Sequence, residues 1–469
     1  MKSIESLYQQ RFGDEPVTVE TLPGAGSSRC YYRIHGHDST VIATVGRDRR
    51  ENRAFLALTD HFLRHGLPVP EVLAVSSDES GYIQEDLGSE SLYDLYVKSG
   101  SESPHFGKAL RDSVDMLVAF HAADYDDVDT DVLYPRSEMD RLAVRWDLNY
   151  FKYCFLKLTG VEIDEQSLED VFGYLTSVVC DSAEKALILR DFQSRNIMLK
   201  NGSPVLIDYQ GARIGNPFYD VASLLWQSRL GLSDRIRWGL AGRYVEKARE
   251  AGMVINDGWE GTLRLFVVFR MLQVLGAYGF RGLHQHKAAF LTPIRTTLKS
   301  LEEVLSEIGD KRLAYLMDAV RNLTGDERFK EDMGSARLKV KIYSFSYKKG
   351  IPEDFTGNGG GFVFDCRAIH NPGRYEQYRS LTGLDRPVQD FLEKDGEILE
   401  FLDSCKSIVD HSVGRYLKRG FSDLSISFGC TGGQHRSVYS AQKMAEHVAV
   451  AFDCDVLLVH REQGIEVML

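Results

Sequence analysis

The feature that most constrains this 469-residue chain is a polar turn between two apolar runs near its middle. The runs cover residues 197–199 and 205–207, and the pair Asn201-Gly202 lies between them. An Asn-Gly pair in this setting is the strongest short-range signal for a β-hairpin. Pairing outward from a two-residue turn brings Asn196 and Asp208 to the open end of the hairpin, and Asp191, just upstream, is expected to face the same space.

These three side chains have the chemistry that phosphoryl transfer needs. One carboxylate orients the acceptor hydroxyl, while an Asn and a second Asp hold the magnesium ion that bridges the phosphates. The spacing therefore predicts Asp191 as the catalytic base, Asn196 and Asp208 as metal ligands, and ATP with Mg²⁺ as cofactors. The alternative is that these residues serve only as turn formers, which is their usual role.

The composition excludes several other classes. With 43% hydrophobic and 26% charged residues, no evident membrane-spanning run and no signal-peptide pattern, the chain is expected to be cytoplasmic, without a membrane partner. Seven cysteines without a C-x-x-C pair argue against a zinc cluster or a disulfide framework. A net charge of -12 opposes a general attraction to nucleic acid.

The pattern along the chain predicts a bilobal kinase-like fold followed by a compact α/β sandwich, a multidomain protein of the α/β and α+β classes. Residues 1–90 read as a small β-rich lobe with one helix at 49–65, and residues 91–324 as a helical lobe interrupted by strands at 187–208. Residues 325–337 are a predicted linker. In residues 338–469, strands at 338–347, 362–367, 424–430 and 456–462 alternate with helices such as 387–417.

The catalytic segment also carries a family resemblance. RDFQSRN followed by LIDYQ resembles the aminoglycoside phosphotransferase and choline kinase superfamily, which shares the protein-kinase fold. Together with QEDLG and GARIGNPFYDVASLL, it looks most similar to the anomeric N-acetylmuramate and N-acetylglucosamine kinases, the AmgK family. The resemblance implies adenine binding by the backbone of residues 84–87, including Glu85 and Leu87. It also implies that Asp220 braces the catalytic loop and that Arg190 is an ion-pair partner.

The small lobe has the segment LPGAGSSRCYYRI, which is similar to the glycine-containing hairpin that covers nucleotide phosphates. An ordinary hairpin turn would look the same. The predicted contacts are Gly24, Gly26, Ser27 and Ser28.

The strand after this hairpin departs from the family pattern. A lysine for the α- and β-phosphates is expected there, yet VIATVG places Thr44 at that position. Arg47, Arg49 or Arg50 could supply the charge. Glu51 would then take an arginine as its partner or remain a solvated carboxylate at a helix start. Weak catalysis in a nucleotide-binding regulator is the alternative.

The acceptor site is the least defined. In RWDLNYFKYCFL, Arg145, Asp147 and Asn149 alternate with aromatic residues, which suits sugar binding by stacking and hydrogen bonding. A helix with an aromatic core face gives the same pattern and is the favoured reading.

Near the C-terminus, LSISFGCTGGQHRSVYS predicts a strand, a glycine-bearing loop and a helix, which together form an anion cradle. Cys430 and Arg436 stand in C-x5-R spacing, as in the phosphate-binding loop of cysteine phosphatases, where the arginine binds two phosphate oxygens. Phosphate binding is favoured over hydrolysis by a Cys430 thiolate. Further contacts are expected from Thr431, Gly432, Gly433, His435 and Ser437.

The same module resembles the C-terminal domain of RapZ, through SFSYKKGIP, FVFDCRAIHNP, LTGLDRPV and GCTGGQHRSV. That domain recognises a small regulatory RNA and senses glucosamine-6-phosphate. The P-loop domain of RapZ is absent from this sequence, so RNA binding is possible but not favoured over binding of a phosphorylated metabolite. The implied pocket residues are Asp365, Arg367, Asn371, Thr431, Gly432, His435 and Arg436.

Both resemblances lead to amino-sugar metabolism. The predicted function is an ATP- and Mg²⁺-dependent kinase of an amino sugar, acting at the anomeric hydroxyl, with a second domain that binds an amino-sugar phosphate. Two alternatives stay open. One is an RNA-linked regulator whose kinase-like domain only senses nucleotide or sugar, and the other is a bifunctional kinase and phosphatase.

Overall fold

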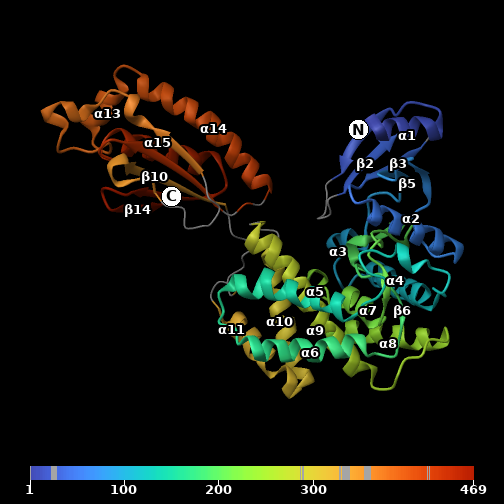
Figure 1. Ribbon diagram of the computed structural model, residues 1–469. Coiled ribbons are helices and arrows are strands. Elements are labelled where there is room, and N and C mark those ends of the chain that lie inside the picture. Colours follow the sequence, from blue (N-terminus) through green and yellow to red (C-terminus); the bar gives the residue numbers. More distant parts are fainter. Residues whose placement is uncertain are drawn as a thin grey trace. The chain divides into compact units, whose positions relative to one another are not determined.

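The computed structural model describes residues 2–22, 29–37, 39–285, 287, 290–326, 329, 338–352, 361–419, 421 and 423–469. The chain forms two compact units, which are described separately (Figure 1). The first comprises Met1–Ala277 and Thr296–Gly325, and the second comprises Tyr278–Arg295 and Asp326–Leu469.

The first unit begins with a small lobe built on an antiparallel sheet of order β1-β2-β3-β5-β4. Helix α1 (Lys2–Phe12) contributes Ile4 and Tyr8 to a core shared with the buried faces of the central strands. Helix α2 (Arg49–Arg64) begins after Asp48, whose carboxylate accepts a hydrogen bond from the amide of Arg50. The strands are β1 (Thr18–Leu22), β2 (Cys30–His35), β3 (Thr40–Val45), β4 (Val72–Val75) and β5 (Gly81–Glu85).

Helices make up most of residues 92–325, as the periodicity predicted. They are α3 (Leu92–Ser99), α4 (Pro104–Ala122), α5 (Arg141–Phe151), α6 (Glu165–Cys180), α7 (Phe218–Leu225), α8 (Asp234–Glu250), α9 (Trp259–Tyr278), α10 (Thr292–Ile308) and α11 (Ala314–Gly325).

The predicted hairpin is confirmed. Strand β7 (Ile197–Lys200) pairs with β8 (Ser203–Leu206) in a register that leaves only Asn201 and Gly202 in the turn. Both turn residues have positive φ, 52° and 80°, as the two-residue turn favoured by right-handed strand twist requires. A second small ladder joins β6 (Ala186–Ile188) to β9 (Arg213–Gly215), and β9 lies beyond the strand region that was predicted.

The expectation that the chain has no apolar run long enough to cross a membrane is wrong. Residues Trp259–His284, which contain α9, are long and apolar enough by length and composition to cross a membrane. However, 61% of the most apolar stretch is buried inside the protein. This helix also carries Arg270, which is buried and hydrogen-bonded to Ser223. The apolar character of α9 is therefore that of a core helix.

An aromatic cluster joins α2 to the turn that follows β8. The ring of Tyr209 stacks on Phe55 at a centroid distance of 4.9 Å and meets Phe62 edge-on at 5.2 Å. Its hydroxyl lies 2.7 Å from that of Thr59, and all four residues are buried. Because Tyr209 directly follows Asp208, this packing fixes the turn against the helix.

The second unit is built on a sheet of order β11-β12-β10-β13-β14, in which only β14 is antiparallel. Its helices are α13 (Arg386–Glu393), α14 (Glu397–Arg419) and α15 (Arg436–Ala451). Its strands are β10 (Lys339–Ser346), β11 (Gly361–Asp365), β12 (Asp423–Cys430), β13 (Asp455–His460) and β14 (Ile465–Met468).

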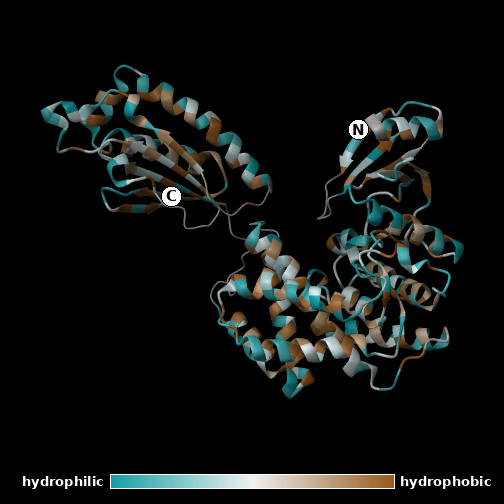
Figure 2. Ribbon diagram, viewed as in Figure 1, coloured by the Kyte–Doolittle hydropathy of each residue, from teal (hydrophilic) through white to brown (hydrophobic). Residues whose placement is uncertain are grey.

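The helices of this unit form one layer. The connections from β11 to β12 and from β12 to β13 cross the sheet in the same direction, so the right-handed crossover rule places α14 and α15 on the same face. The two helices contact each other, and α15 packs on β10, β12 and β13. Figure 2 shows apolar and polar residues alternating around α14, as expected of a helix that covers one side of a sheet.

The predicted single helix over residues 387–417 is wrong. The chain forms α13 and α14 instead, separated at Gly396, whose φ of 79° lies in the left-handed region that ends a helix. Strand β14 was not predicted.

Candidate functional site

The three predicted catalytic residues lie together at the open end of the β7–β8 hairpin. The side-chain amide of Asn196 donates to the backbone carbonyl of Asp191 at 2.8 Å and to Oδ2 of Asp208 at 3.4 Å. The amide of Ile207 donates to the carbonyl of Asn196 at 2.9 Å, which extends the ladder beyond the named strands. The hairpin therefore brings together the residues that the sequence predicted would meet.

The backbone at this site is strained. Among the described residues, only four other than glycine have clearly positive φ, and two of them lie here, Arg190 at 68° and Asp208 at 64°. A third, Asn201 at 52°, lies in the turn at the opposite end of the hairpin. Such conformations are uncommon outside glycine and concentrate at functional sites. The strain at Asn201 belongs to the turn, whereas at Arg190 and Asp208 it aims side chains within the site.

Asp208 is in an environment suited to a cation. Burial, and then the negative charge of Asp191, raise the pKa of the Asp208 carboxyl. A hydrogen bond from Gln210 at 2.9 Å and the charge of Arg29 oppose that rise. A divalent cation would favour the ionised form of this carboxylate. The amide oxygen of Asn196 and the carboxylate of Asp208 are donors that Mg²⁺ accepts, so these residues fit the ion.

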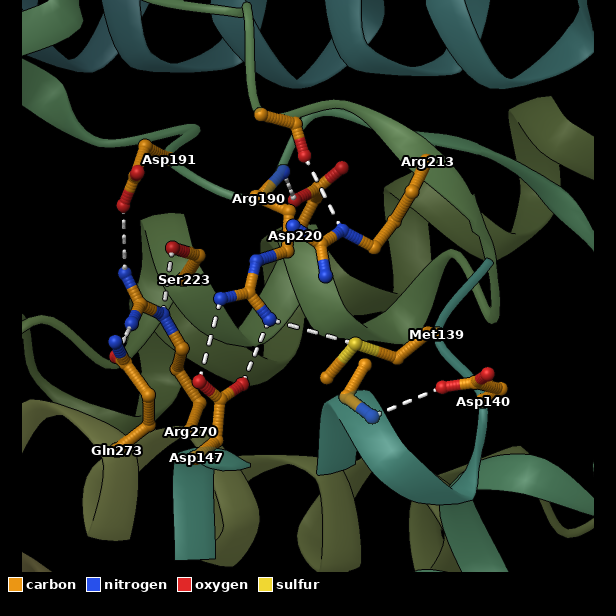
Figure 3. Close-up of polar contacts among 12 residues, drawn as sticks. Met139, Asp140, Asp147, Arg190, Asp191, Arg213, Asp220, Ser223, Arg270 and Gln273 are labelled. Atoms are coloured by element: carbon orange, nitrogen blue, oxygen red, sulfur yellow. Dashed lines mark hydrogen bonds and ion pairs between the residues drawn. The ribbon is translucent and has the colours of Figure 1, made fainter. Parts of the chain in front are cut away.

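Asp220 braces the catalytic segment from α7. Its carboxylate accepts a hydrogen bond from the amide of Arg190 at 2.9 Å (Figure 3). It also accepts from the amide of Leu189 at 2.5 Å and lies 3.0 Å from Nε2 of His121. The other ring nitrogen of His121 is 2.8 Å from the hydroxyl of Tyr244. Asp220 is completely buried, so its function is to hold the strained backbone at Arg190.

Arg190 is an ion-pair partner, in agreement with the sequence interpretation. Its guanidinium contacts both carboxylate oxygens of Asp147, at 2.7 and 3.3 Å, and lies over the ring of Tyr219. Figure 3 shows this pair between the catalytic segment and α5.

Arg270 is a residue that the sequence interpretation missed. It extends from α9 and places Nη2 3.4 Å from Oδ1 of Asp191, while its Nε donates to Ser223 at 3.0 Å. Its side chain is 5% exposed, whereas that of Asp191 is 50% exposed. The only signal in the sequence was an arginine inside the apolar run at residues 265–272 of this helix.

Arg213 adds a further positive charge. It is buried, and burial and then the charge of Arg190 lower its pKa to about 10. No carboxylate among the described residues forms an ion pair with it. Figure 3 shows Arg190, Arg213 and Arg270 together with the carboxylates of Asp147, Asp191 and Asp220.

The three acceptor candidates on α5 do not converge. Asp147 is paired with Arg190, while Arg145 forms an ion pair with Glu169 on α6. Asn149 is partly buried, and its backbone carbonyl accepts from the amide of Lys152. Helical geometry places Arg145 and Asn149 on one face and Asp147 on another. The favoured alternative, a helix with an aromatic core face, is correct only in part, because Phe151 is buried whereas Trp146 and Tyr153 are exposed.

The predicted nucleotide contacts are only partly described. Gly24, Gly26, Ser27 and Ser28 lie outside the described residues. Glu85, at the end of β5, forms an ion pair with Lys200, and Leu87 is buried. The Glu85 side chain is therefore engaged with the large lobe, which leaves backbone groups for the predicted contact with adenine.

Thr44 occupies the β3 position where a phosphate-binding lysine was expected, and it is completely buried. The arginines suggested as replacements point elsewhere. Arg49 pairs with Asp78, and Arg50 pairs with Asp48 and Tyr134. Arg47 is exposed.

The partner of Glu51 is Arg29, which the sequence interpretation did not identify. Its Nη2 lies 3.6 Å from the Glu51 carboxylate and donates to the Glu51 carbonyl at 3.1 Å. The side chain of Arg29 is 1% exposed. The available signal was an arginine directly before a strand, in the segment between the glycine-rich hairpin and β3.

In the second unit, the predicted strand, loop and helix are present, with β12 ending at Cys430 and α15 beginning at Arg436. The Cys430 sulfur lies 3.2 Å from the hydroxyl of Ser437. Burial opposes ionisation of this thiol, but hydrogen bonds from Ser437 and from the amides of Gly433 and Gln434 lower its pKa overall. The loop amides thus converge on a point that favours negative charge.

Arg436 is anchored beneath the loop. Its Nη1 donates to the carbonyls of Arg367 and Ile369, at 2.9 and 2.7 Å. Its Nε is buried and has no hydrogen-bond partner within the part of the chain that the structure describes. This orphaned donor is one that a phosphate oxygen could satisfy.

The remaining predicted pocket residues have structural partners. Asp365 pairs with Arg367, both at exposed positions, and Asn371 caps the amide of Gly373. His435 is buried with Nε2 2.9 Å from the carbonyl of Tyr378. Thr431 and Gly432 are exposed in the loop, and the Thr431 carbonyl accepts from Ser346.

A small β-lobe, a helical lobe and a catalytic segment with Asp191, Asn196 and Asp208 define a kinase-type phosphotransferase domain. Residues 18–253, which make up half of the chain, match the sequence model of the phosphotransferase enzyme family. The chain belongs to that family. Residues 338–464 match the RapZ C-terminal domain, so the second unit is a domain of that type.

Among curated proteins, a nucleotide-binding protein of Alkalilimnicola ehrlichii is 35% identical over 37% of this chain and 54% of its own length. The chain thus spans about half of that relative. Among solved structures, ADP-bound aminoglycoside phosphotransferase APH(2'')-Ib is 15% identical, covering 65% of this chain and 98% of its own, with a TM-score of 0.45. The ethanolamine kinase of Plasmodium vivax is 12% identical, covering 61% of this chain and 82% of its own, with a TM-score of 0.45.

Proposed function

We propose that this protein transfers the γ-phosphoryl group of ATP to a hydroxyl of an amino sugar, of the N-acetylmuramate or N-acetylglucosamine type and at the anomeric position. The observation that carries the proposal is the convergence of Asp191, Asn196 and Asp208 at the strained end of one hairpin. The proposed domains are a nucleotide-binding lobe at 1–90, a catalytic lobe at 91–324, a linker at 325–337 and a metabolite-binding domain at 338–469, in a cytoplasmic protein.

Each residue has a role set by its surroundings. Asp191, with a half-exposed carboxylate, accepts the proton of the acceptor hydroxyl and aims its oxygen at the γ-phosphorus. Asn196 and Asp208 would hold Mg²⁺, which neutralises charge on the phosphate oxygens. Arg270 orients Asp191 through its 3.4 Å contact. Arg213, which forms no ion pair with a described carboxylate, supports an acceptor that carries a negative charge, as the carboxylate of N-acetylmuramate does.

The test is a phosphoryl-transfer assay with purified protein, Mg-ATP and a panel of N-acetylmuramate, N-acetylglucosamine, glucosamine and an aminoglycoside. Turnover is expected on an acetylated amino sugar, faster on the carboxylate-bearing one, and Asp191→Asn should abolish it. If the wild-type protein binds ATP but phosphorylates no sugar, the alternative of a nucleotide-sensing regulator replaces the enzyme.

For the second unit, we infer that the loop at Cys430–Arg436 binds the phosphate of an amino-sugar phosphate. The orphaned Nε of Arg436 and the convergent amides support binding, and RNA is the alternative ligand. Hydrolysis, the bifunctional alternative, is less favoured because Cys430 is only 3% exposed. Glucosamine-6-phosphate should raise the unfolding temperature whereas glucosamine should not, and Arg436→Lys should reduce the shift. Equal shifts with both sugars would contradict this role.

A further inference from the structure

The β3 position that lacks a lysine faces a defined niche in the small lobe. Thr44 pairs with Tyr31 on β2 and with Tyr82 on β5, so these three side chains share one face of the sheet. Helix α2 covers part of that face, since Phe55 stacks on Tyr82 at 4.7 Å. A threonine hydroxyl carries no charge. Any cation in this niche must therefore come from a residue other than Thr44.

Arg29, the residue directly before β2, supplies that cation. It lies two residues before Tyr31, and alternation along an extended chain puts both on the same face. Its guanidinium meets the carboxylate of Glu51 and lies 5.9 Å from the centre of the Phe55 ring. Burial acts to lower the pKa of Arg29, but the neighbouring Tyr82 and Glu51 outweigh it and raise the pKa, so the group stays charged.

Arg29 is also connected by packing to the residue that follows Asp208. The Phe55 ring that Arg29 lies over stacks on Tyr209, which comes directly after Asp208 in the chain. The guanidinium of Arg29 is thus linked to Glu51 of α2 by an ion pair and to the turn that carries Asp208 through this ring stack. In kinases of this fold, the space between those two carboxylates holds the nucleotide phosphates.

We propose that Arg29 binds the phosphate oxygens of the nucleotide and that Glu51 orients it, so that this pair replaces the usual lysine and glutamate. This proposal rests on the proposed phosphotransferase function, and its ligand class is a nucleoside di- or triphosphate. A guanidinium suits this task because it stays charged when buried and presents several donors. Arg49 and Arg50 are exposed and paired with acidic residues outside the niche.

The experiment measures binding of ATP, ADP and adenosine to the full-length protein by calorimetry in the presence of Mg²⁺. Arg29→Ala should weaken ATP and ADP binding by about 10- to 100-fold, the range for losing a charge-assisted hydrogen bond. Adenosine binding should stay unchanged, because the adenine contacts lie elsewhere. Unaltered adenosine binding also shows that the variant is folded.

Matched variants sharpen the test. Arg49→Ala and Arg50→Ala remove exposed arginines near α2 and should leave ATP binding unchanged. Arg29→Lys should retain part of the affinity. The double variant Arg29→Ala/Thr44→Lys, which moves the cation to the β3 position, should bind ATP more tightly than Arg29→Ala alone.

The outcomes separate the two proposals. If the wild-type protein binds ATP and Arg29→Ala binds it equally well, the role of Arg29 is refuted while the phosphotransferase proposal stands. A wild-type protein that binds neither ATP nor ADP would refute the phosphotransferase proposal and this inference with it.

Discussion

At the scale of single residues, Asp191 and Asp208 show how neighbouring groups determine the chemistry available to two carboxylates. Asp191 is half-exposed and has one guanidinium contact, which suits a group that must meet a substrate. Asp208 is held at a φ of 64° beside Asp191, in surroundings that raise its pKa. One environment favours an accessible base and the other favours coordination of a cation.

The metal role of Asp208 predicts a specific loss. With ADP present, Mg²⁺ should raise the unfolding temperature of the wild-type protein, and a chelator should reverse the change. Asp208→Asn should remove most of this shift and lower kcat by about 100-fold or more, because one charged ligand of the ion is lost. Asp131→Asn, at an exposed position, is the control. A normal shift in Asp208→Asn would exclude the metal role.

Cys430 predicts a pH effect on stability. Because the pKa of its thiol is lowered in the folded state, the unfolded state binds more protons between the two pKa values. The contribution of Cys430 to the free energy of unfolding should therefore be fully present above the ordinary thiol pKa. It should be lost as the pH falls through the pKa that this thiol has in the folded state. Denaturant unfolding at pH 7 and 9.5 should show that Cys430→Ser removes a gain in stability at the higher pH.

Cys405→Ser is the matched control for this measurement. Burial raises the pKa of Cys405 to about 11. The contribution of Cys405 to stability therefore depends on pH in the opposite direction, since it is lost as the pH rises above the ordinary thiol pKa. Equal pH profiles for the two variants would show that the loop does not stabilise a thiolate.

At the scale of elements, the catalytic segment depends on α7. Asp220 ties this helix to two consecutive amides of the segment, and His121 of α4 contacts the same carboxylate. Three elements that are distant in the sequence therefore fix one strained backbone conformation.

Asp220→Asn should reduce the free energy of unfolding by about 3 kcal/mol, because a carboxamide can accept from only one of the two buried backbone amides that the carboxylate now satisfies. The rate of phosphoryl transfer should fall with little change in KM for ATP, since the strained loop carries Asp191. Asp234→Asn, at an exposed helix start, should change stability by less than about 0.5 kcal/mol. Thermal and denaturant unfolding provide the measurement, and equal stabilities of the two variants would contradict the bracing role.

Local signals predicted the elements that hold the candidate sites. The Asn-Gly hairpin and the strand, loop and helix around Cys430 each depend on a few consecutive residues, so periodicity and turn chemistry define them. The contacts of Arg29 with Glu51 and of Arg270 with Asp191 join residues 22 and 79 positions apart. Such pairs follow from packing, which a single sequence does not encode in any short pattern. The break at Gly396 was missed because apolar periodicity continues through it.

At the scale of the whole molecule, the kinase-like fold and the following α/β domain agree with the fold class expected from the sequence. The second unit has its own core, which includes Val340, Ile426, Val409 and Val448 from both layers. Such a core is what independent folding requires.

The module at residues 338–469 should therefore fold when expressed alone. Cooperative thermal unfolding and dispersed amide NMR signals would show this, and the glucosamine-6-phosphate shift should persist in the fragment. A matched variant with Val340→Asp, which buries a charge in the core, should not fold. Absence of a cooperative transition in the wild-type fragment would mean that its core is incomplete without the rest of the chain.

The contact between Tyr209 and α2 has a mechanical consequence for the first unit. The helix that carries Glu51, the partner of Arg29, is packed through Phe55, Phe62 and Thr59 against the residue that follows Asp208. A displacement of α2 would therefore move the turn that carries Asp208 as well. This packing should hold the proposed phosphate-binding pair, Arg29 and Glu51, at a fixed distance from the proposed metal ligand.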